Sequence, residues 1–127
     1  MMKLGSFMKI MKEVLIELLQ AFRNNHPNEF FAYLGSDSGN VIDHYVVVPL
    51  FYQAPDSVSY RTDLLPMDFT IKGTIHSHPS LNPNPSHADL NSFINKGNTH
   101  IIVTYPYTID TIHVYNKEGN PIKLEII

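Results

Sequence analysis

The chain has 127 residues, of which 43% are hydrophobic and 17% charged, so it is long enough for one domain with a buried core. The net charge is −3 and the nine Lys and Arg residues are scattered, which argues against an electrostatic grip on nucleic acid or an anionic membrane. There is no cysteine. This excludes disulfides, thiolate metal ligands and a cysteine nucleophile, so any metal must be held by histidines and carboxylates.

The beginning of the chain, MMKLGSFMKIMKEVLIELL, does not have the pattern of a secretory signal peptide. Lys9, Lys12, Glu13 and Glu17 interrupt every apolar run in it. Elsewhere no stretch approaches the ~18 apolar residues of a membrane helix. We therefore expect a soluble, cytoplasmic protein that does not associate with a membrane.

The first half of the chain predicts one helix and two strands. Apolar residues at helical spacing, with charges on the other face, predict a helix over residues 9–24 that stops at NNHP. A short apolar run ending at glycine predicts a strand over residues 29–34, and SDSGN predicts a turn. The segment VIDHYVVVPLF, residues 41–51, has the β-branched and aromatic composition of a second strand, and residues 52–68 predict a loop.

The second half predicts a strand over residues 69–76, the loop LNPNP, and a helix over residues 86–97. Three further strands are expected over residues 100–107, 108–116 and 121–127. The last two would form a hairpin across KEGN. With no repeat or linker, the chain is predicted to be a single domain over residues 1–127. Its interspersed elements indicate an α/β (α+β) class, with a sheet flanked by helices.

The stretch GTIHSHPSLNPNPSHAD gathers residues that are suited to binding a metal ion. His76 and His78 are two apart on a predicted strand and therefore project to the same side. Asp89 follows in the first turn of the next predicted helix. Two imidazoles and one carboxylate suit a three-ligand zinc site with a fourth position open for water. An open position is what a hydrolytic metal centre requires.

Glu29 is the candidate general base for such a centre. It opens an otherwise apolar strand, where a residue of low β-propensity has no obvious packing role. Hydrolysis of an amide needs a group that takes a proton from water and returns it to the leaving amine.

Each of these features also has a purely structural interpretation. An H-x-H pair is common without a metal, and Ser86 with Asp89 reads equally as an N-cap and its capping-box partner. Pro83 and Pro85 could form no more than a rigid loop. Glu29 could be an ordinary solvent-facing residue after Pro27.

Taken together, H-S-H-P, six residues, S-x-x-D and an upstream P-x-E closely resemble the JAMM motif. That motif defines the Mov34/MPN/JAB metalloprotease family, which includes the isopeptidases of the proteasome lid and the COP9 signalosome and the AMSH deubiquitinases. The resemblance implies a JAB/MPN domain, in which a mixed, curved sheet lies between helices in a three-layer arrangement like that of cytidine deaminase.

The resemblance also implies roles for individual residues. His76, His78 and Asp89 would hold one catalytic zinc ion per chain, and Glu29 would act as the general base. Ser86 would donate a hydrogen bond to the oxyanion that forms in the reaction. The family's substrates are peptide or lysine isopeptide bonds after the C-terminal tail of ubiquitin or a ubiquitin-like protein. Such a tail could bind by adding a strand to an exposed sheet edge.

The sequence departs from the eukaryotic deubiquitinases, because one short helix and then a strand follow Asp89 and leave no room for their insertion. The chain therefore looks like a minimal, standalone prokaryotic domain of the archaeal kind. A small ubiquitin-like or sulfur-carrier protein becomes the expected substrate. The loop PSLNPNPS also resembles that of RadC-like JAB proteins, which leaves a hydrolase with another substrate open.

A second alternative is a non-catalytic MPN module that acts as a scaffold, although such modules typically lack part of the metal set. The apolar face of the first helix is expected to be core, and its length would also suit a homodimer interface. The other histidines lack metal-ligand spacing among themselves and are expected to be hydrogen-bonded or exposed, with His87 pointing outward: His26, His44, His87, His100 and His113. For Tyr105-Pro106-Tyr107, a substrate-groove rim and a core or turn role both remain open.

Overall fold

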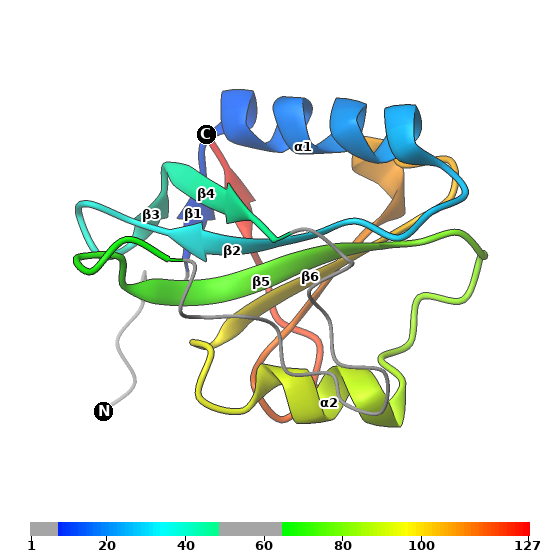
Figure 1. Ribbon diagram of the computed structural model, residues 1–127. Coiled ribbons are helices and arrows are strands. Elements are labelled where there is room, and N and C mark those ends of the chain that lie inside the picture. Colours follow the sequence, from blue (N-terminus) through cyan, green and yellow to red (C-terminus); the bar gives the residue numbers. More distant parts are fainter. Residues whose placement is uncertain (1–7, 49–64) are drawn as a thin grey trace.

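A five-stranded mixed sheet forms the middle layer of the computed structural model, which describes residues 8–48 and 65–127. Helix α1 (Lys12–Asn25) covers one face of the sheet and the shorter helix α2 (His87–Phe93) covers the other (Figure 1). The strand order is β4-β2-β5-β6-β7, and only β5 and β6 run parallel. The strands are β2 (Phe31–Gly35), β4 (His44–Val47), β5 (Ile71–His78), β6 (Thr99–Thr104) and β7 (Ile112–Tyr115). The predicted α+β class and its three-layer arrangement are confirmed.

A second, three-stranded sheet brings distant parts of the chain together. It consists of β1 (Lys9–Ile10), flanked in parallel by β3 (Val41–Ile42) and β8 (Glu125–Ile126). The prediction that residues 9–11 belong to the first helix is therefore wrong. The backbone of Lys9 and Ile10 pairs with both neighbours, and the fully buried Ile10 packs into the core as a strand residue.

The strand predicted over residues 41–51 is divided into two in its described part, residues 41–48, and residues 49–51 lie outside the described residues. β3 ends at Ile42, and β4 starts at His44 in the larger sheet. Between them, the Asp43 carboxylate accepts hydrogen bonds from the Asp37 N–H and lies 2.6 Å from His44 Nδ1, which holds the chain at the point where it changes sheets.

The predicted hairpin at the C-terminal end is only partly correct. The chain does turn over KEGN, with Asn116 N–H donating to the carbonyl of Asn120. After the turn, however, the pairing with β7 is reduced to an isolated bridge between Tyr115 and Pro121. Proline cannot donate to a strand ladder, and the chain then leaves to pair with β1.

Other predicted boundaries move by a few residues. The helix expected over 86–97 ends at Phe93, and residues Ile109–Thr111 form a 3-10 turn rather than strand. In that turn Thr108 and Thr111 cap one another. The strands predicted over 29–34, 69–76 and 100–107 span Phe31–Gly35, Ile71–His78 and Thr99–Thr104. Of the loop predicted over residues 52–68, residues 52–64 lie outside the described part of the chain.

The main core lies between α1 and the sheet, as predicted for the apolar face of this helix. The buried helix residues are Val14, Leu15, Leu18, Leu19 and Phe22, and the sheet residues beneath them are Ala32, Leu34, Ile75, Ile101 and Val103. Tyr107 is buried in the same core, whereas Tyr105 is 45% exposed. Tyr107 thus takes the core role that the sequence had left open.

Strand alternation sends the intervening residues to the α2 face. There Phe93 of α2 packs against Ile102 and Tyr115, and Phe31 packs against Tyr33 farther along β2. His76 and His78 belong to this face, since they alternate with Ile75 and Ser77 along β5. The C-terminal ends of β5 and β6 lie at the same end of the sheet as the start of the antiparallel β2. Neither α1 nor α2 is both long and apolar enough to cross a bilayer.

Candidate metal centre

Strand β5 presents both histidines to the space between the sheet and α2. His76 pairs with Phe31 of β2 on one side and with Ile102 of β6 on the other, and both neighbours are buried. A residue in a central strand, paired on both sides, has little freedom to move. The strand ends at His78, where Pro79 cannot continue the ladder.

Asp89 approaches the histidines from the first turn of α2. The Ser86 side chain accepts a hydrogen bond from the Asp89 N–H at 3.0 Å, and the Asp89 carboxylate accepts one from the Ser86 N–H at 2.8 Å. This is the capping box that the sequence predicted. The cap fixes the direction of the Asp89 side chain, so the structural and metal-binding interpretations of these residues are compatible.

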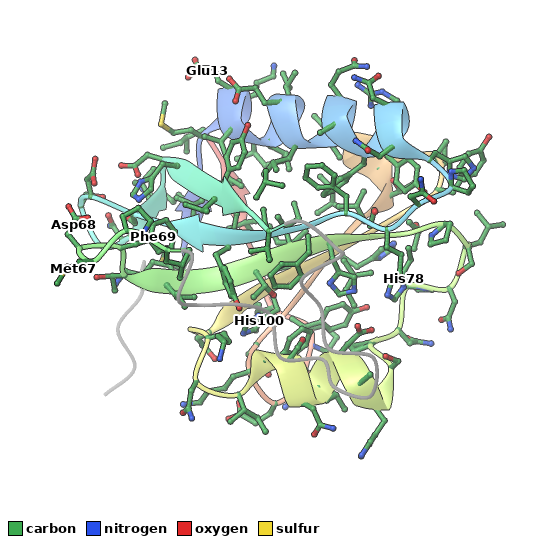
Figure 2. All side chains as sticks on the ribbon, in the orientation of Figure 1. Glu13, Met67, Asp68, Phe69, His78 and His100 are labelled. Atoms are coloured by element: carbon green, nitrogen blue, oxygen red, sulfur yellow. The ribbon has the colours of Figure 1, made fainter. Side chains whose placement is uncertain are left out.

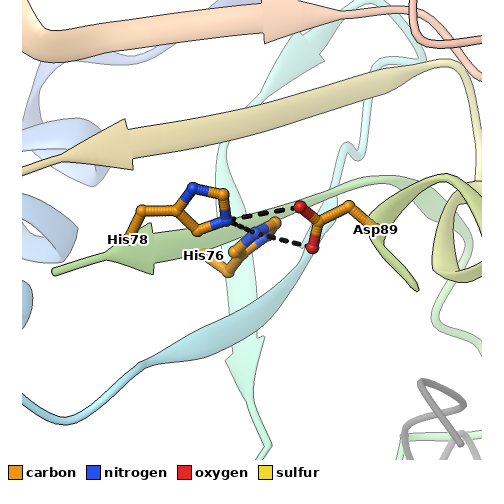
Figure 3. A group of neighbouring side chains, drawn as sticks. All are labelled: His76, His78 and Asp89. Carbon is orange, nitrogen blue, oxygen red and sulfur yellow. Dashed lines mark hydrogen bonds and ion pairs between the residues drawn. The ribbon is translucent and has the colours of Figure 1, made fainter. Parts of the chain in front are cut away.

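Three potential ligand atoms converge at this point (Figure 3). The two Nε2 atoms of His76 and His78 are 3.0 Å apart. The Asp89 oxygens lie 3.2 Å from His76 Nε2 and 3.3 Å from His78 Nε2. In a tetrahedral zinc site with ligand bonds of about 2.0–2.1 Å, neighbouring ligand atoms are roughly 3.3 Å apart. The donor set and its spacing therefore fit zinc.

The orientation of His78 also suits a metal ligand. Its Nδ1 lies 3.2 Å from the carbonyl oxygen of Asn82 and can donate to it, which leaves the Nε2 lone pair facing His76 and Asp89 in the neutral ring. Without a metal, the hydrogen bond to Asp89 raises the pKa of His78 above its ordinary value. Burial alone would raise the pKa of Asp89, but the hydrogen bonds from His76 and His78 outweigh it and hold that pKa far below its usual range.

Glu29 lies just before β2 rather than within it, and it is exposed. Its position is fixed by the next residue, because the Phe30 N–H donates to Ser77 Oγ at 2.9 Å and the Ser77 N–H donates to the Phe30 carbonyl at 3.0 Å. In the described parts of the chain the Glu29 carboxylate has no hydrogen bond or ion pair. A free carboxylate beside the site is what a general base requires.

All five predicted site residues line one cavity of about 430 Å³: Glu29, His76, His78, Ser86 and Asp89. Ser86 Oγ accepts the helix-capping hydrogen bond, so its own hydroxyl proton remains available for a substrate oxygen. Pro79, Asn82 and Pro85 form the loop side of the cavity.

The sequence did not identify Ser77 as part of this arrangement. Its side chain points to the α1 side of β5, is fully buried, and links β5 to the residue beside Glu29. The only available signal was its place between two histidines of a strand, which sends it to the opposite face from theirs.

A second group of potential ligands, Asp37, Asp43 and His44, was also not predicted. It lies near Asp68, at the end of the sheet opposite His78 (Figure 2). His44 Nδ1 is 2.6 Å from the Asp43 carboxylate, which also accepts from the Asp37 backbone. The Asp43 carboxylate thus links the Asp37 backbone to His44, which is a structural role for this group.

His100 has a structural role, as expected for the remaining histidines, and His87 is exposed. The fully buried His100 ring stacks on Phe93 at a centroid distance of 4.1 Å. Its Nδ1 lies 2.8 Å from the Thr74 hydroxyl, and its Nε2 lies 2.9 Å from the Gly97 carbonyl. A neutral ring that donates from Nε2 and accepts at Nδ1 satisfies both contacts, and it fixes α2 to the sheet.

Burial lowers the pKa of His100 to about 4, only partly offset by the hydrogen bond to Gly97. An unfolded histidine titrates near about 6.5, so between these pH values the unfolded chain binds a proton that the folded protein does not. Stability should therefore fall as the pH drops from about 6.5 to 4, by on the order of 3 kcal/mol from this residue. Urea unfolding of the native protein and of His100→Gln at pH 7 and pH 5 checks this. The same pH dependence in both proteins would contradict it.

Comparison with known proteins places this geometry in a family. The profile of the family described as prokaryotic homologs of the JAB domain matches residues 11–115. A probable metalloprotease of Haloferax volcanii is 33% identical over 118 residues, covering 86% of this chain and 73% of the relative. The chain belongs to the JAB-domain family of JAMM metalloproteases.

Two solved structures of JAB-domain proteins agree with this assignment. A JAB1/MPN-domain protein of Archaeoglobus fulgidus superimposes with a TM-score of 0.77 at 34% identity, covering 97% of this chain and all of that one. A structure reported as "JAMM: A Metalloprotease-like Zinc Site in the Proteasome and Signalosome" gives 0.72 at 36% identity, covering 95% and 98%. The family resemblance inferred from the motif is confirmed. The group His76, His78 and Asp89 of this JAB domain could hold a metal ion, and its donor atoms suit zinc.

Proposed function

We propose that this JAB domain is a zinc-dependent peptidase or isopeptidase, with His76, His78 and Asp89 as the zinc ligands. The observation that carries the proposal is the convergence of these three side chains with Glu29 and Ser86 around one cavity. When bound, zinc would supply Lewis acidity, which activates water at neutral pH and polarises a carbonyl group.

The residues of the chain would divide the remaining work. Glu29 takes a proton from the attacking water as the new C–O bond forms at the carbonyl carbon. Ser86 donates its free hydroxyl proton in a hydrogen bond to the developing oxyanion. When the C–N bond breaks, Glu29 returns the proton to the departing amine nitrogen. The exposed position of Glu29 beside the cavity suits this transfer, since its carboxylate has room to move between water and amine.

We propose the C-terminal tail of a small ubiquitin-like or sulfur-carrier protein as the substrate, in the cytoplasm and without nucleic acid or membrane as partners. Two observations support this choice: the family assignment, and a cavity of about 430 Å³ that lies between the C-terminal end of β5 and residues 79–86, beside the candidate metal ligands. The chain carries a net charge of −3, which does not favour binding to nucleic acid.

The test is a cleavage assay read by intact mass. Zinc-loaded protein is given the host's small ubiquitin-like proteins, both as C-terminal fusions and as lysine conjugates. We expect release of the free tail from at least one of the two forms, which would also establish the bond type. A protein that holds zinc but releases no tail would contradict the proposed substrate. A protein that binds no zinc at all would instead favour the non-catalytic scaffold.

A further inference from the structure

The segment that joins the metal histidines to Ser86 is held at three backbone carbonyls. We call residues 79–85 the metal loop. The Tyr105 N–H donates to the carbonyl of Ser80, and His78 Nδ1 lies 3.2 Å from that of Asn82. The third carbonyl, that of Pro83, accepts a hydrogen bond of 2.6 Å from the phenol of Tyr115. The proposed mechanism gives Tyr115 no part in the reaction.

Tyr115 is well placed to act as a fixed anchor. It is the last residue of β7, pairs with His100 of β6, and is only 7% exposed. Its ring packs against Phe93 of α2 and Ile102 of β6. Burial raises the pKa of the phenol above its ordinary value, so the hydroxyl is protonated and able to donate at neutral pH.

The two neighbouring carbonyls of the metal loop are mechanically coupled. The carbonyls of Asn82 and Pro83 are separated by the φ and ψ rotations of Pro83, and the proline ring fixes φ. The residue before a proline is itself restricted in conformation. Holding the Pro83 carbonyl therefore limits where the Asn82 carbonyl can point, and that carbonyl faces His78 Nδ1.

We infer that Tyr115 is a positioning residue for the metal centre: its hydrogen bond to Pro83 orients the Asn82 carbonyl, which accepts from His78 Nδ1–H when Nε2 binds a metal ion. Nε2 then faces His76 and Asp89. This inference rests on the proposed metal centre and goes beyond it, because Tyr115 is not among the residues that line the cavity. A hydrogen-bond partner of a metal-ligating histidine typically changes metal affinity or activity by about 10–100-fold, and Tyr115 acts one step farther out.

The test is Tyr115→Phe, which keeps the ring that packs on Phe93 and removes only the hydroxyl. Zinc affinity is measured by competition with a chelator, and the hydrogen bond of the His78 Nδ1–H is read from the ¹H chemical shift of that group in the zinc-loaded protein. We expect zinc to bind roughly three- to tenfold more weakly. The ¹H signal of the His78 Nδ1–H should move upfield, because its hydrogen bond to the Asn82 carbonyl is weakened. In the cleavage assay kcat should fall while KM is unchanged, since Tyr115 does not line the cavity.

Tyr45→Phe is the matched control. It removes a phenol hydrogen bond of similar length, 2.9 Å to Glu17, on the α1 face of the sheet. It should leave zinc affinity and the His78 Nδ1–H signal unchanged. Pro83→Ala tests the link between the Pro83 and Asn82 carbonyls from the side of the metal loop. Alanine does not fix the φ angle at position 83, so this variant should also bind zinc more weakly.

Native zinc affinity and a native His78 Nδ1–H signal in both Tyr115→Phe and Pro83→Ala would overturn the inference, even if thermal stability fell. Both readouts are independent of substrate. Failure of the cleavage assay would therefore count against the proposed substrate and leave this result interpretable. Failure of the native protein to bind zinc would count against the metal centre itself.

Discussion

Glu29→Gln is expected to abolish most hydrolysis while the protein keeps its zinc. Glutamine has the same size and can still accept a hydrogen bond, but it cannot take a proton from water. Loss of a positioned general acid–base group typically costs about 10²–10⁴-fold in rate. Because Glu29 is not among the converging ligand atoms, zinc content should remain at the native level. Turnover of the substrate identified by intact mass, together with metal analysis of the same sample, measures both quantities.

Glu13→Gln is the matched control for this substitution. Glu13 lies in the first turn of α1 on the solvent side of the molecule, away from the sheet (Figure 2). The same loss of one negative charge there should leave turnover unchanged. Full activity of Glu29→Gln would show that another group accepts the proton, and the proposed mechanism would be wrong.

Asp89→Asn is expected to separate metal binding from helix capping. An amide oxygen can still accept the hydrogen bond from the Ser86 N–H, so the start of α2 should form as before. The neutral amide is a much poorer zinc ligand than a carboxylate. Zinc affinity should therefore fall on the order of 100-fold or more, because loss of a residue that only hydrogen-bonds to a ligand already costs about 10–100-fold. Chelator competition measures the affinity, and helix content is followed by circular dichroism.

The difference in stability between zinc-free Asp89→Asn and the zinc-free native protein is expected to depend on pH. In the zinc-free protein the pKa of His78 is raised by Asp89, so the stabilisation from this pair is fully present below the unfolded histidine pKa of about 6.5. It is lost as the pH rises through the folded pKa. Zinc-free Asp89→Asn should therefore be less stable than the native protein at pH 5.5 and close to it at pH 9. Retention of native zinc affinity by this variant would exclude Asp89 as a ligand.

Much of the site could be predicted from the sequence because its parts are local. The same-side projection of His76 and His78 follows from strand periodicity, and the cap that directs Asp89 follows from the residues S-x-x-D. Glu29 is different, since nothing local brings it near the histidines. Its inclusion depended on the family resemblance, and the structure places it beside them through the antiparallel pairing of β2 with β5.

The features that the sequence missed depend on contacts between distant segments. Lys9 and Ile10 have a pattern that suits a helix, and only pairing with residues 41–42 and 125–126 makes them a strand. The hydrogen bonds of Ser77 to Phe30 and of Tyr115 to Pro83 span 47 and 32 residues. No periodicity or local motif encodes such partners, so these contacts become visible only in the folded chain.

The most direct test of the metal centre is a crystal structure of the zinc-loaded protein with anomalous data collected on both sides of the zinc absorption edge. We expect a single strong peak between His76 Nε2, His78 Nε2 and the Asp89 carboxylate, which disappears below the edge. The same peak should be present at full height in Glu29→Gln and lower in Asp89→Asn. A fully loaded crystal with its peak elsewhere, or with none between these side chains, would contradict the assignment of this JAB domain as a zinc enzyme.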